Sequence, residues 1–600
     1  MDLPPRVGHT EGFLNDDLIL EFLNNSDIDE QFSDDDDDDP MISTYEHPVE
    51  VEPLESEADE QEEETNCTAI ETPSPGPRTD TTPRRLFWKK KYFQEKPHPV
   101  PIDYTNIQNP PSERTPLQYH EDYFDDDFFN LAAEKTNMYS VVKTGKSINT
   151  NPQELKKFFG INLLMGCIRY PRLSMYWQKG IQLNLISECM SRDRFLLLRK
   201  HLHVVDTVNK PNDADSNALW KVQPVIQKVR DVCLQLPRGN GSYSIDEQMI
   251  PFLGRCKLKQ YVKNKPRPVG LKNFVLTTSK GLVLDFEVYQ GQSTPLVNRE
   301  LGLGPAVIMR LVSSLPQGSF VYFDRYFTTI PLLQVLSEKG IEGTGTVMKN
   351  RIRDIELSQK KMNRGESNEY VRSDEKIVVT EWMDNQKVVM ASTCAGKHPE
   401  LHVRRWSKAE KRHVEVDCPS VVCKYNQCMG GVDICNQQME CYRTWFRTRK
   451  WTVKVILHFL DLATVNSWML YREDALANKR SNREIKDLLK FRMSIAEARL
   501  ATPARKRRTE DDGNRGIEEV ENGMPEPPKK IYTPSPIPGV DKRYDGYDHW
   551  PVVDDIHSSR ICRLESCCKR TKLRCEKCDV YLCLSKDKCC FKLFHVKPRS

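Results

Sequence analysis

The stretch Ser242-Tyr243-Ser244-Ile245-Asp246-Glu247-Gln248-Met249-Ile250-Pro251 decides the fold of this 600-residue chain. Its polar and apolar residues alternate as in a half-buried strand, and turn-forming residues stand at both ends, so Asp246 is expected on a strand. Asp324 and Asp433 recur later in similar apolar surroundings. Three such carboxylates in a chain with a basic body predict a divalent-metal site for phosphodiester chemistry.

The charge of the chain is strongly asymmetric. Residues 1–64 hold 24 Asp and Glu and one basic residue, Arg6, whereas residues 65–600 hold 87 Lys and Arg and 62 Asp and Glu. An acidic tail on a basic body is typical of a nucleic-acid-binding protein. The chain has neither an uninterrupted apolar run of about 18 residues nor a secretory leader, so we expect no membrane span and no secretion.

Several kinds of sequence follow one another along the chain. Residues 1–111 are acidic and poor in large apolar side chains, which predicts disorder. Residues 112–241 show helical periodicity, with Asn151-Pro152 as a helix start. From Tyr243 to about residue 350, strand and helix signals alternate, which predicts a mixed α/β fold.

The second half of the chain changes character again. Residues 351–420 are polar, with strand-like pieces at 376–382 and 387–392, and are expected to interrupt the α/β fold as an insertion. Helices return after Asp433, most plainly at 452–471, and a linker rich in proline and charge follows.

Eight of the 19 cysteines lie between Cys562 and Cys590. Scattered thiols in a chain without a secretory signal indicate a reducing compartment, where a dense cluster indicates metal binding and not disulfides. Tetrahedral zinc takes four Cys or His ligands, which the short paired spacings here fit.

Ordered motifs occur between about residues 115 and 600. The motifs are Arg192-Asp193-Arg194-Phe195, Ser244-Ile245-Asp246-Glu247, Asn264-Lys265-Pro266-Arg267-Pro268-Val269-Gly270-Leu271-Lys272, Phe323-Asp324-Arg325-Tyr326-Phe327-Thr328-Thr329, Gly343-Thr344-Gly345-Thr346-Val347, Tyr425-Asn426-Gln427-Cys428-Met429-Gly430-Gly431-Val432-Asp433, Arg449-Lys450-Trp451 and the C-terminal cysteine-rich element. Each motif is weak alone, but in number, order and spacing they specifically resemble the motifs of piggyBac-type transposases.

The resemblance implies a multidomain α/β protein with an RNase H-like DDE/D catalytic core. The implied order is a disordered acidic region (1–111), a helical dimerisation and DNA-binding domain (112–241 and 445–500), the catalytic core (242–350 and 421–444) around an insertion domain (351–420), a linker (501–555) and a cysteine-rich zinc-binding domain (556–600). The implied activity is cut-and-paste transposition of double-stranded DNA at TTAA targets by a homodimer. The family also includes host-domesticated derivatives, so a DNA- or chromatin-binding protein that does not transpose is the alternative.

By the same resemblance the catalytic residues are Asp246, Asp324 and Asp433, holding two Mg²⁺ (or Mn²⁺) ions. Asp246 bridges both ions, Asp324 binds one and Asp433 the other. Family members often carry a second Asp three residues after the third one, whereas this chain has Asn436, an amide that brings no charge. For a single Asp, a turn or cap residue is the alternative.

Two basic segments are candidate DNA contacts, because phosphate binding needs positive charge. The first comprises Arg255, Lys257, Lys259, Lys263, Lys265, Arg267 and Lys272; the second contains Arg449, Lys450 and Trp451. Trp451 matches a family tryptophan that would stack on an unpaired base, and core packing is its alternative. A solvated loop is the alternative for the first segment.

Seven residues fit the family's zinc motif, namely Cys562, Cys567, Cys575, Cys578, Cys583, Cys590 and His595. Two zinc ions need eight ligands, and Cys589 or His557 is the candidate for the last. By resemblance this domain recognises the ends of the transposon, and a RING- or PHD-like module that binds protein is the rival interpretation.

The linker carries a candidate nuclear localisation signal, Ala504-Arg505-Lys506-Arg507-Arg508 with Lys529-Lys530. Because chromosomal DNA is the implied substrate, we expect a nuclear protein. A solvated linker that merely carries charge is the alternative.

Overall fold

The computed structural model describes residues 86–99, 111–238, 241–263, 265–352, 355, 357–358, 362–408, 410–501, 537–556, 559–565, 567–584 and 589–596. The chain divides into two units, residues 1–504 and 505–600, and each is described by itself. The candidate nuclear localisation signal and His557 lie outside the described residues, as do residues 1–85.

The first unit opens with helices, as the periodicity predicts. They are α2 (Pro116–Glu121), α3 (Asp126–Thr144), α4 (Pro152–Cys167), α5 (Asn184–Ser187), α6 (Arg192–His201) and α7 (Gln223–Gln235). Asn151 caps α4 by accepting from the backbone N–H of Glu154, and Pro152 occupies its first position, which confirms the predicted start. Aromatic rings of α3 and α4 pack edge to face, with the Phe129 and Phe159 centroids 5.2 Å apart.

A ten-stranded mixed sheet follows, with the order β1-β8-β9-β10-β7-β6-β2-β4-β3 and β5 also paired to β4. Its strands are β1 (Trp88–Lys89), β2 (Ser242–Pro251), β3 (Lys259–Tyr261), β4 (Val269–Thr278), β5 (Val283–Val288), β6 (Phe320–Phe323), β7 (Glu342–Thr346), β8 (Ser367–Arg372), β9 (Val378–Met383) and β10 (Lys387–Ser392). The stretch that carries Asp246 is β2, which pairs antiparallel with β4 and parallel with β6.

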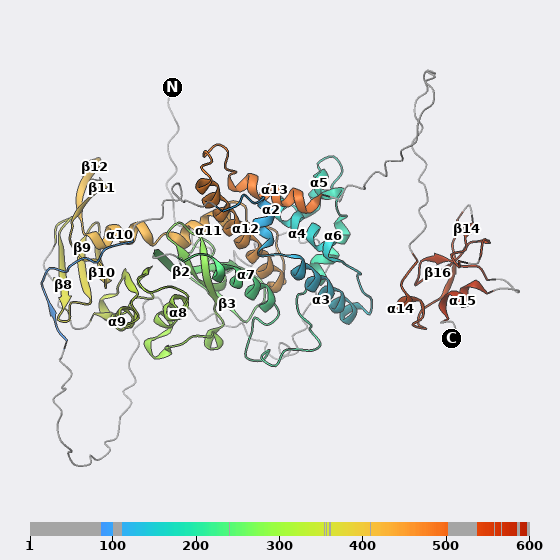
Figure 1. Cartoon of the computed structure of the whole chain (residues 1–600), viewed down its shortest axis with the longest axis horizontal. Helices are drawn as coiled ribbons and strands as arrows, with labels where there is room; N and C mark the ends of the chain where they lie inside the picture. Colours follow the sequence, from blue (N-terminus) through green and yellow to red (C-terminus); the bar gives the residue numbers. More distant parts are fainter. Residues whose placement is uncertain are drawn as a thin grey trace, which may run out of the picture. The chain divides into compact units, whose positions relative to one another are not determined.

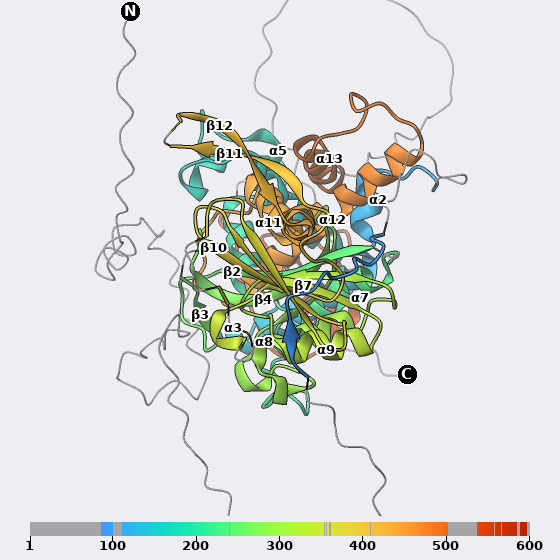
Figure 2. The ribbon, with the colours of Figure 1, turned by 90° about the vertical axis from the view of Figure 1, so that its left-hand side faces the viewer.

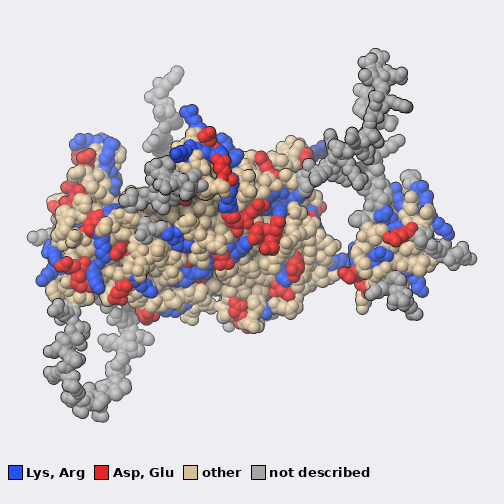
Figure 3. All heavy atoms as spheres, viewed as in Figure 1, with Lys and Arg blue, Asp and Glu red and all other residues tan. Residues whose placement is uncertain are grey.

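The segment expected to be an insertion contributes to this same sheet. Strand β10 pairs antiparallel with β7, and β9 and β8 continue from it. Only β11 (Leu401–Ser407) and β12 (Arg412–Cys418) form a ribbon of their own. β7 would otherwise present an open edge, and unpaired strand edges gain hydrogen bonds by adding strands. Lys and Arg side chains gather at the tip of the ribbon (Figure 3).

Helices cover both faces of the sheet (Figures 1 and 2). The helices in the second half of this unit are α8 (Leu303–Val312), α9 (Ile330–Glu338), α10 (Ser420–Cys428), α11 (Gly431–Cys441), α12 (Trp451–Ala477) and α13 (Leu488–Leu500). In Figure 2, α11 and α12 lie on one face and α8 and α9 on the other. Helix α12 is long and apolar enough to cross a membrane, but 89% of its most apolar window is buried within the unit, as in the core helix of a globular domain.

Residues 86–99 were predicted to be disordered, and this prediction is wrong for these residues. They form a strap in which β1 pairs with β8 and the Phe93 side chain is buried. The Lys96 ammonium lies 2.7 Å from Glu342 on β7, and His98 Nε2 lies 2.5 Å from the Tyr322 hydroxyl on β6. Composition alone misses the strap because its order depends on these distant partners.

A four-charge cluster is buried between β5, α7 and α8. Asp285 lies 3.1 Å from Arg230 and 2.8 Å from Arg310, and Glu287 faces the same two arginines at 3.3 and 3.2 Å. Burial raises the pKa of Asp285 to about 6 and that of Glu287 to about 7. The cluster joins the helical block to the sheet.

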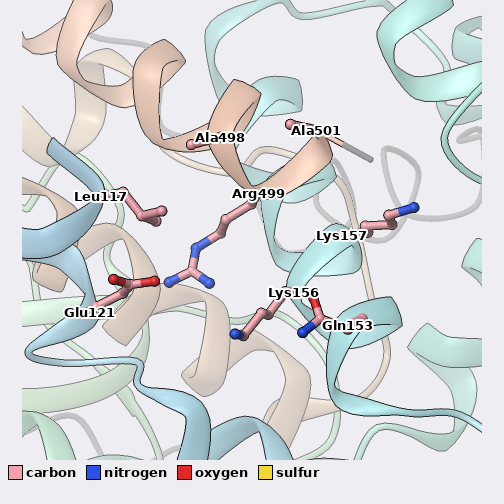
Figure 4. Close-up of a pocket in the computed structure, with 8 residues that line it drawn as sticks. All are labelled: Leu117, Glu121, Gln153, Lys156, Lys157, Ala498, Arg499 and Ala501. Atoms are coloured by element: carbon pink, nitrogen blue, oxygen red, sulfur yellow. The ribbon is translucent and has the colours of Figure 1, made fainter. Parts of the chain in front are cut away.

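A pocket opens between α2, α4 and α13 (Figure 4). In Figure 4 the guanidinium of Arg499 points into the space between Glu121 and Lys156. Arg499 is 6% exposed, and its Nη2 donates to Phe124 O at 3.2 Å. Glu121 and Asp126 favour the charge of Arg499, but burial outweighs them and lowers the pKa of Arg499 to about 10.

The second unit is small and rich in cysteine. Its elements are α14 (Val540–Arg543), β13 (Pro551–Val553), β14 (Arg560–Ile561), β15 (Arg570–Thr571), β16 (Leu573–Cys575), β17 (Val580–Tyr581) and α15 (Cys590–His595). Its core consists mainly of cysteines, with Leu582 and Phe594 among the few large apolar side chains buried there. A core of this size needs additional stabilisation, such as bound metal.

Candidate active site

The pairing of β2 with β6 places two of the predicted carboxylates side by side. The strands are parallel, and Ile245 pairs with Phe323. The next residue on each strand is an aspartate, Asp246 on β2 and Asp324 directly after β6 ends. The two side chains therefore occur in register at the carboxyl end of β6.

Glu247 joins this pair, which the sequence reasoning missed. Carboxylate oxygens of Asp246, Glu247 and Asp324 all lie within 4.8 Å of one another. Regular strand alternation would place the side chains of neighbouring residues on opposite faces. Glu247 nevertheless reaches the same cluster as Asp246, just beyond the last residue of β2 that pairs with β6.

Asp433 approaches from the helix face of the sheet. It lies in the first turn of α11, exposed to solvent, and is not part of the close three-carboxylate cluster. Gly431 sets the approach: a Cβ there would lie 2.3 Å from Thr278 O and 3.2 Å from the Ser244 Cβ. Glycine therefore allows the start of α11 to touch β2 and β4.

The electrostatics of the cluster are those of crowded carboxylates. Burial, followed by the nearby Glu247 carboxylate, raises the pKa of Asp246 well above its usual range and raises the pKa of Asp324 as well. Burial also opposes the charge of Glu247, but the ammonium groups of Lys265 and Lys272 hold its pKa below the usual value. The ionised cluster therefore requires positive charge beside it.

Two lysines supply part of that charge. Lys265 Nζ lies 3.2 Å from Glu247 Oε1. Lys272 is 5% exposed, and its ammonium lies 4.5 Å from the ring centroid of Tyr326 and 4.9 Å from that of Phe274. Lys272 thus serves the carboxylate cluster from within the core, and its burial differs from the exposed phosphate contact that its sequence position predicted.

The donor set fits a hard divalent cation. Mg²⁺ and Mn²⁺ prefer carboxylate oxygens, and Asp246, Glu247 and Asp324 supply them at mutual distances suited to one or two ions. Asp433 lies near enough to the cluster that all three predicted aspartates act on Tyr425, whose pKa is raised by burial first and by Asp324, Asp246 and Asp433 in addition.

The remaining DNA-contact candidates occupy different environments. Arg255, Lys257, Lys263 and Arg267 are exposed, and Lys259 is half-buried in β3. Arg267 forms an ion pair with Glu440 of α11. Arg449 is exposed, Lys450 lies 5.4 Å from the Tyr139 ring centroid, and Trp451 is half-buried against the main core at the start of α12.

The second unit gathers eight candidate ligands into two clusters. Cys562, Cys567, Cys583 and Cys590 form one cluster, and His549, Cys575, Cys578 and His595 form the other, each with ligand atoms within 4.8 Å. Along the chain the ligands of the two clusters alternate in pairs. Such interleaving was left open by the spacing alone.

Histidine geometry in the second cluster fits a metal. His549 directs Nδ1 to Cys575 and Cys578 Sγ at 3.5 Å each, while its Nε2 lies 3.0 Å from Asp545 Oδ1. A carboxylate behind a ligating histidine is the usual outer-shell arrangement at zinc. The Nε2 of His595 is buried without a hydrogen-bond partner, as expected for a nitrogen reserved for a metal.

Among the described residues, His549 and not Cys589 completes the second cluster of candidate ligands. The other candidate, His557, lies outside the described residues. Cys589 instead caps α15, where its sulfur accepts from the Lys592 N–H at 3.4 Å. His549 stands 13 residues before Cys562, outside the cysteine-rich run that framed the search. A histidine shortly before the first cysteine of the run is the sequence signal that points to this candidate ligand.

Comparisons with known proteins agree with this arrangement. The sequence profile of a family described as Transposase IS4 matches residues 115–468. The chain is 30% identical over 540 residues to human PiggyBac transposable element-derived protein 3, covering 87% of this chain and 84% of that protein. It is 32% identical over 397 residues to human PiggyBac transposable element-derived protein 2, covering 64% and 65%.

A solved structure shares the fold. The cryo-EM structure of a piggyBac transposase synaptic complex with hairpin DNA matches with a TM-score of 0.55 and 22% identity, covering 66% of this chain and 83% of that chain. Together with the match to the family profile and the human relatives, the likeness shows that this chain belongs to the piggyBac transposable element-derived family of transposase-like proteins.

Proposed function

We propose that this protein is a DNA transposase of the piggyBac type, which cuts and rejoins phosphodiester bonds with an RNase H-like core. The observation that carries the proposal is the in-register pair Asp246 and Asp324, joined by Glu247 and flanked by two lysines. A fold that merely binds DNA has no need for crowded, buried carboxylates, which oppose one another and repel phosphate.

Each residue has a role in this proposal. Asp246, Asp324 and Asp433 would hold two Mg²⁺ or Mn²⁺ ions, whose chemistry would be to activate the attacking hydroxyl and to stabilise charge on the leaving oxygen. Lys265 lies against Glu247 and partly offsets the negative charge of the cluster. Exposed Arg255 and Arg267 bind backbone phosphates beside the cluster, which makes DNA binding sensitive to salt.

The second unit is proposed to bind two zinc ions and through them to fold and recognise the ends of the transposon. Support comes from the two four-ligand clusters and from the buried, unpartnered Nε2 of His595. Two transposon ends must be brought together, so we propose a homodimer. The substrate would be chromosomal, so we propose a nuclear location.

The test is excision of a donor DNA flanked by the cognate inverted repeats, with Asp246→Ala as the control. We expect excision by the wild-type protein and none by the variant. Excision that persisted in Asp246→Ala would refute the role of the carboxylates.

A second candidate function is a domesticated protein that binds DNA or chromatin without transposing. The human relatives are named as element-derived proteins, which favours this candidate. Salt-sensitive binding of the cognate ends with no excision by the wild-type protein would support it. Binding without cleavage that is unchanged in Asp246→Ala would strengthen that outcome.

A further inference from the structure

Two side-chain hydrogen bonds join β2 to the start of α11 and to the chain just before it. Ser244, Asp246 and Gln248 share one face of β2 because strand side chains alternate. The Ser244 hydroxyl donates to Met429 O just before α11, and Gln248 Nε2 donates to Asn436 Oδ1 at 2.7 Å within α11. Asp246 therefore lies between two hydrogen bonds that fix the helix to the strand.

Helical spacing gives the matching order on α11. Residues three apart lie on the same side of a helix, so Asp433 and Asn436 share one face. Two residues along a strand advance about 6.6 Å and three along a helix about 4.5 Å. Gln248 and Asn436 are therefore one step farther along β2 and α11 than Asp246 and Asp433.

The orientation of both amides follows from their neighbours. Gln248 is 1% exposed, and its Oε1 lies 3.0 Å from His458 Nε2 and 3.3 Å from Asn273 Nδ2. These two nitrogens occupy the carbonyl end of the Gln248 amide, which leaves its Nε2 to donate to Asn436. The Asn436 oxygen is thereby committed to a buried network of strand and helix side chains.

We propose that Asn436 is a positioning residue that holds α11, and with it Asp433, against β2, and that it supplies no ligand to the metal site. The inference rests on the proposed metal site and assigns a role to the position where the family often has a second aspartate. An amide suits this role, because a carboxylate at 436 would add a further negative charge to an already crowded cluster.

The experiment uses the full-length, zinc-loaded protein and two measurements, Mn²⁺ affinity by calorimetry and amide hydrogen exchange of α11 without Mn²⁺. The variants are Asn436→Ala, Gln248→Met and the two combined. Gln437→Ala, an exposed neighbour on α11, is the matched control. Zinc outcompetes Mn²⁺ for thiolate and imidazole ligands, so the cysteine clusters do not contribute to the Mn²⁺ signal.

We expect each single variant to weaken Mn²⁺ binding about tenfold, as outer-shell changes do, and to speed exchange in α11 about fivefold. The double variant should be no worse than Gln248→Met, because the bond that Asn436→Ala removes is already lost in Gln248→Met. Gln437→Ala should change neither measurement.

Two results would overturn the proposal. A direct ligand role predicts that Asn436→Ala weakens Mn²⁺ binding while exchange in α11 stays as in the wild type and Gln248→Met has no effect. No change in exchange in either variant also rejects positioning. If Gln248→Met does not fold, hydrogen exchange in α11 of the variant Asn436→Ala, a substitution at a half-exposed position, decides whether Asn436 is a positioning residue. Asp246→Ala separates this question from the metal site itself, which is wrong if that variant binds Mn²⁺ normally.

Discussion

The close contact between Gly431 and the sheet leads to a specific prediction for the substitution Gly431→Ala. In Gly431→Ala the new Cβ would lie 2.3 Å from Thr278 O and 2.4 Å from Thr277 Oγ1. Ordinary contacts begin at 3.4 Å, so the start of α11 must move out by about 1 Å. Thr278 ends a central strand and cannot yield. The neighbouring Gly430 offers a matched control, because a Cβ there meets nothing within 4 Å.

The expected magnitudes follow from this geometry. Overpacking costs about 1–3 kcal/mol of unfolding free energy, of which the better helix propensity of alanine recovers up to about 1 kcal/mol. A displacement of about 1 Å in a catalytic group costs roughly a hundredfold in rate. Gly431→Ala should therefore lose about 1–2 kcal/mol and roughly a hundredfold in excision. Gly430→Ala should stay within about 0.5 kcal/mol of the wild type.

Urea unfolding and Mn²⁺ calorimetry measure the two effects separately. If Gly431→Ala proves as stable as Gly430→Ala and binds Mn²⁺ equally well, then α11 does not need its close approach to β2. The account of Asp433 given above would then be wrong.

Three further predictions concern other parts of the molecule. Arg267→Ala should change the free energy of unfolding by less than about 1 kcal/mol, since its ion pair with Glu440 is exposed. The same substitution should reduce the slope of log affinity for DNA against log salt concentration by about 1, measured by anisotropy titration. An unchanged slope would mean that Arg267 binds no phosphate. His549→Ala should reduce the zinc content from two ions to one by native mass spectrometry, whereas Cys589→Ala should keep both, and the reverse result would restore Cys589 as the ligand. The pKa of Glu287 is about 7 in the folded state and about 4.5 in the unfolded state. Protonated Glu287 therefore stabilises the fold fully below about pH 4.5, and this stabilisation is lost as the pH rises through about 7. The loss in the free energy of unfolding is up to about 3 kcal/mol. Glu287→Gln should flatten that part of the curve in urea titrations at pH 5 to 8, and an equally steep curve would contradict the raised pKa.

Much of the fold could be predicted because local signals decide it. Asn151-Pro152 starts α4, and the turn signals around β2 mark a strand that the structure contains. In contrast, local signals do not predict the mutual position of Asp246 and Asp324, because it depends on the parallel pairing of strands about 75 residues apart. The resemblance to a known family supplied that pairing, and periodicity could not.

The misses share a physical cause, since each depends on a partner far away in sequence. The strap at 86–99 is ordered by Glu342 and Tyr322, and β8–β10 join the sheet because β7 accepts β10. Glu247 lies within 4.8 Å of Asp324, which is 77 residues farther along the chain. His549 lay outside the run of cysteines that defined the search. The domain boundaries assigned from sequence stay a prediction.

The alternation of candidate ligands between the two cysteine clusters has a consequence for how the second unit would take up metal. The first cluster closes the chain from Cys562 to Cys590, and the second from His549 to His595, so each loop encloses ligands of the other cluster. Closing one loop brings the ends of the other loop closer together. The second closure therefore costs less conformational entropy than the first. Metal uptake should therefore be cooperative, with half-loaded molecules scarce during titration. A unit built in this way tolerates no trimming from either end between His549 and His595, since every cut removes a ligand.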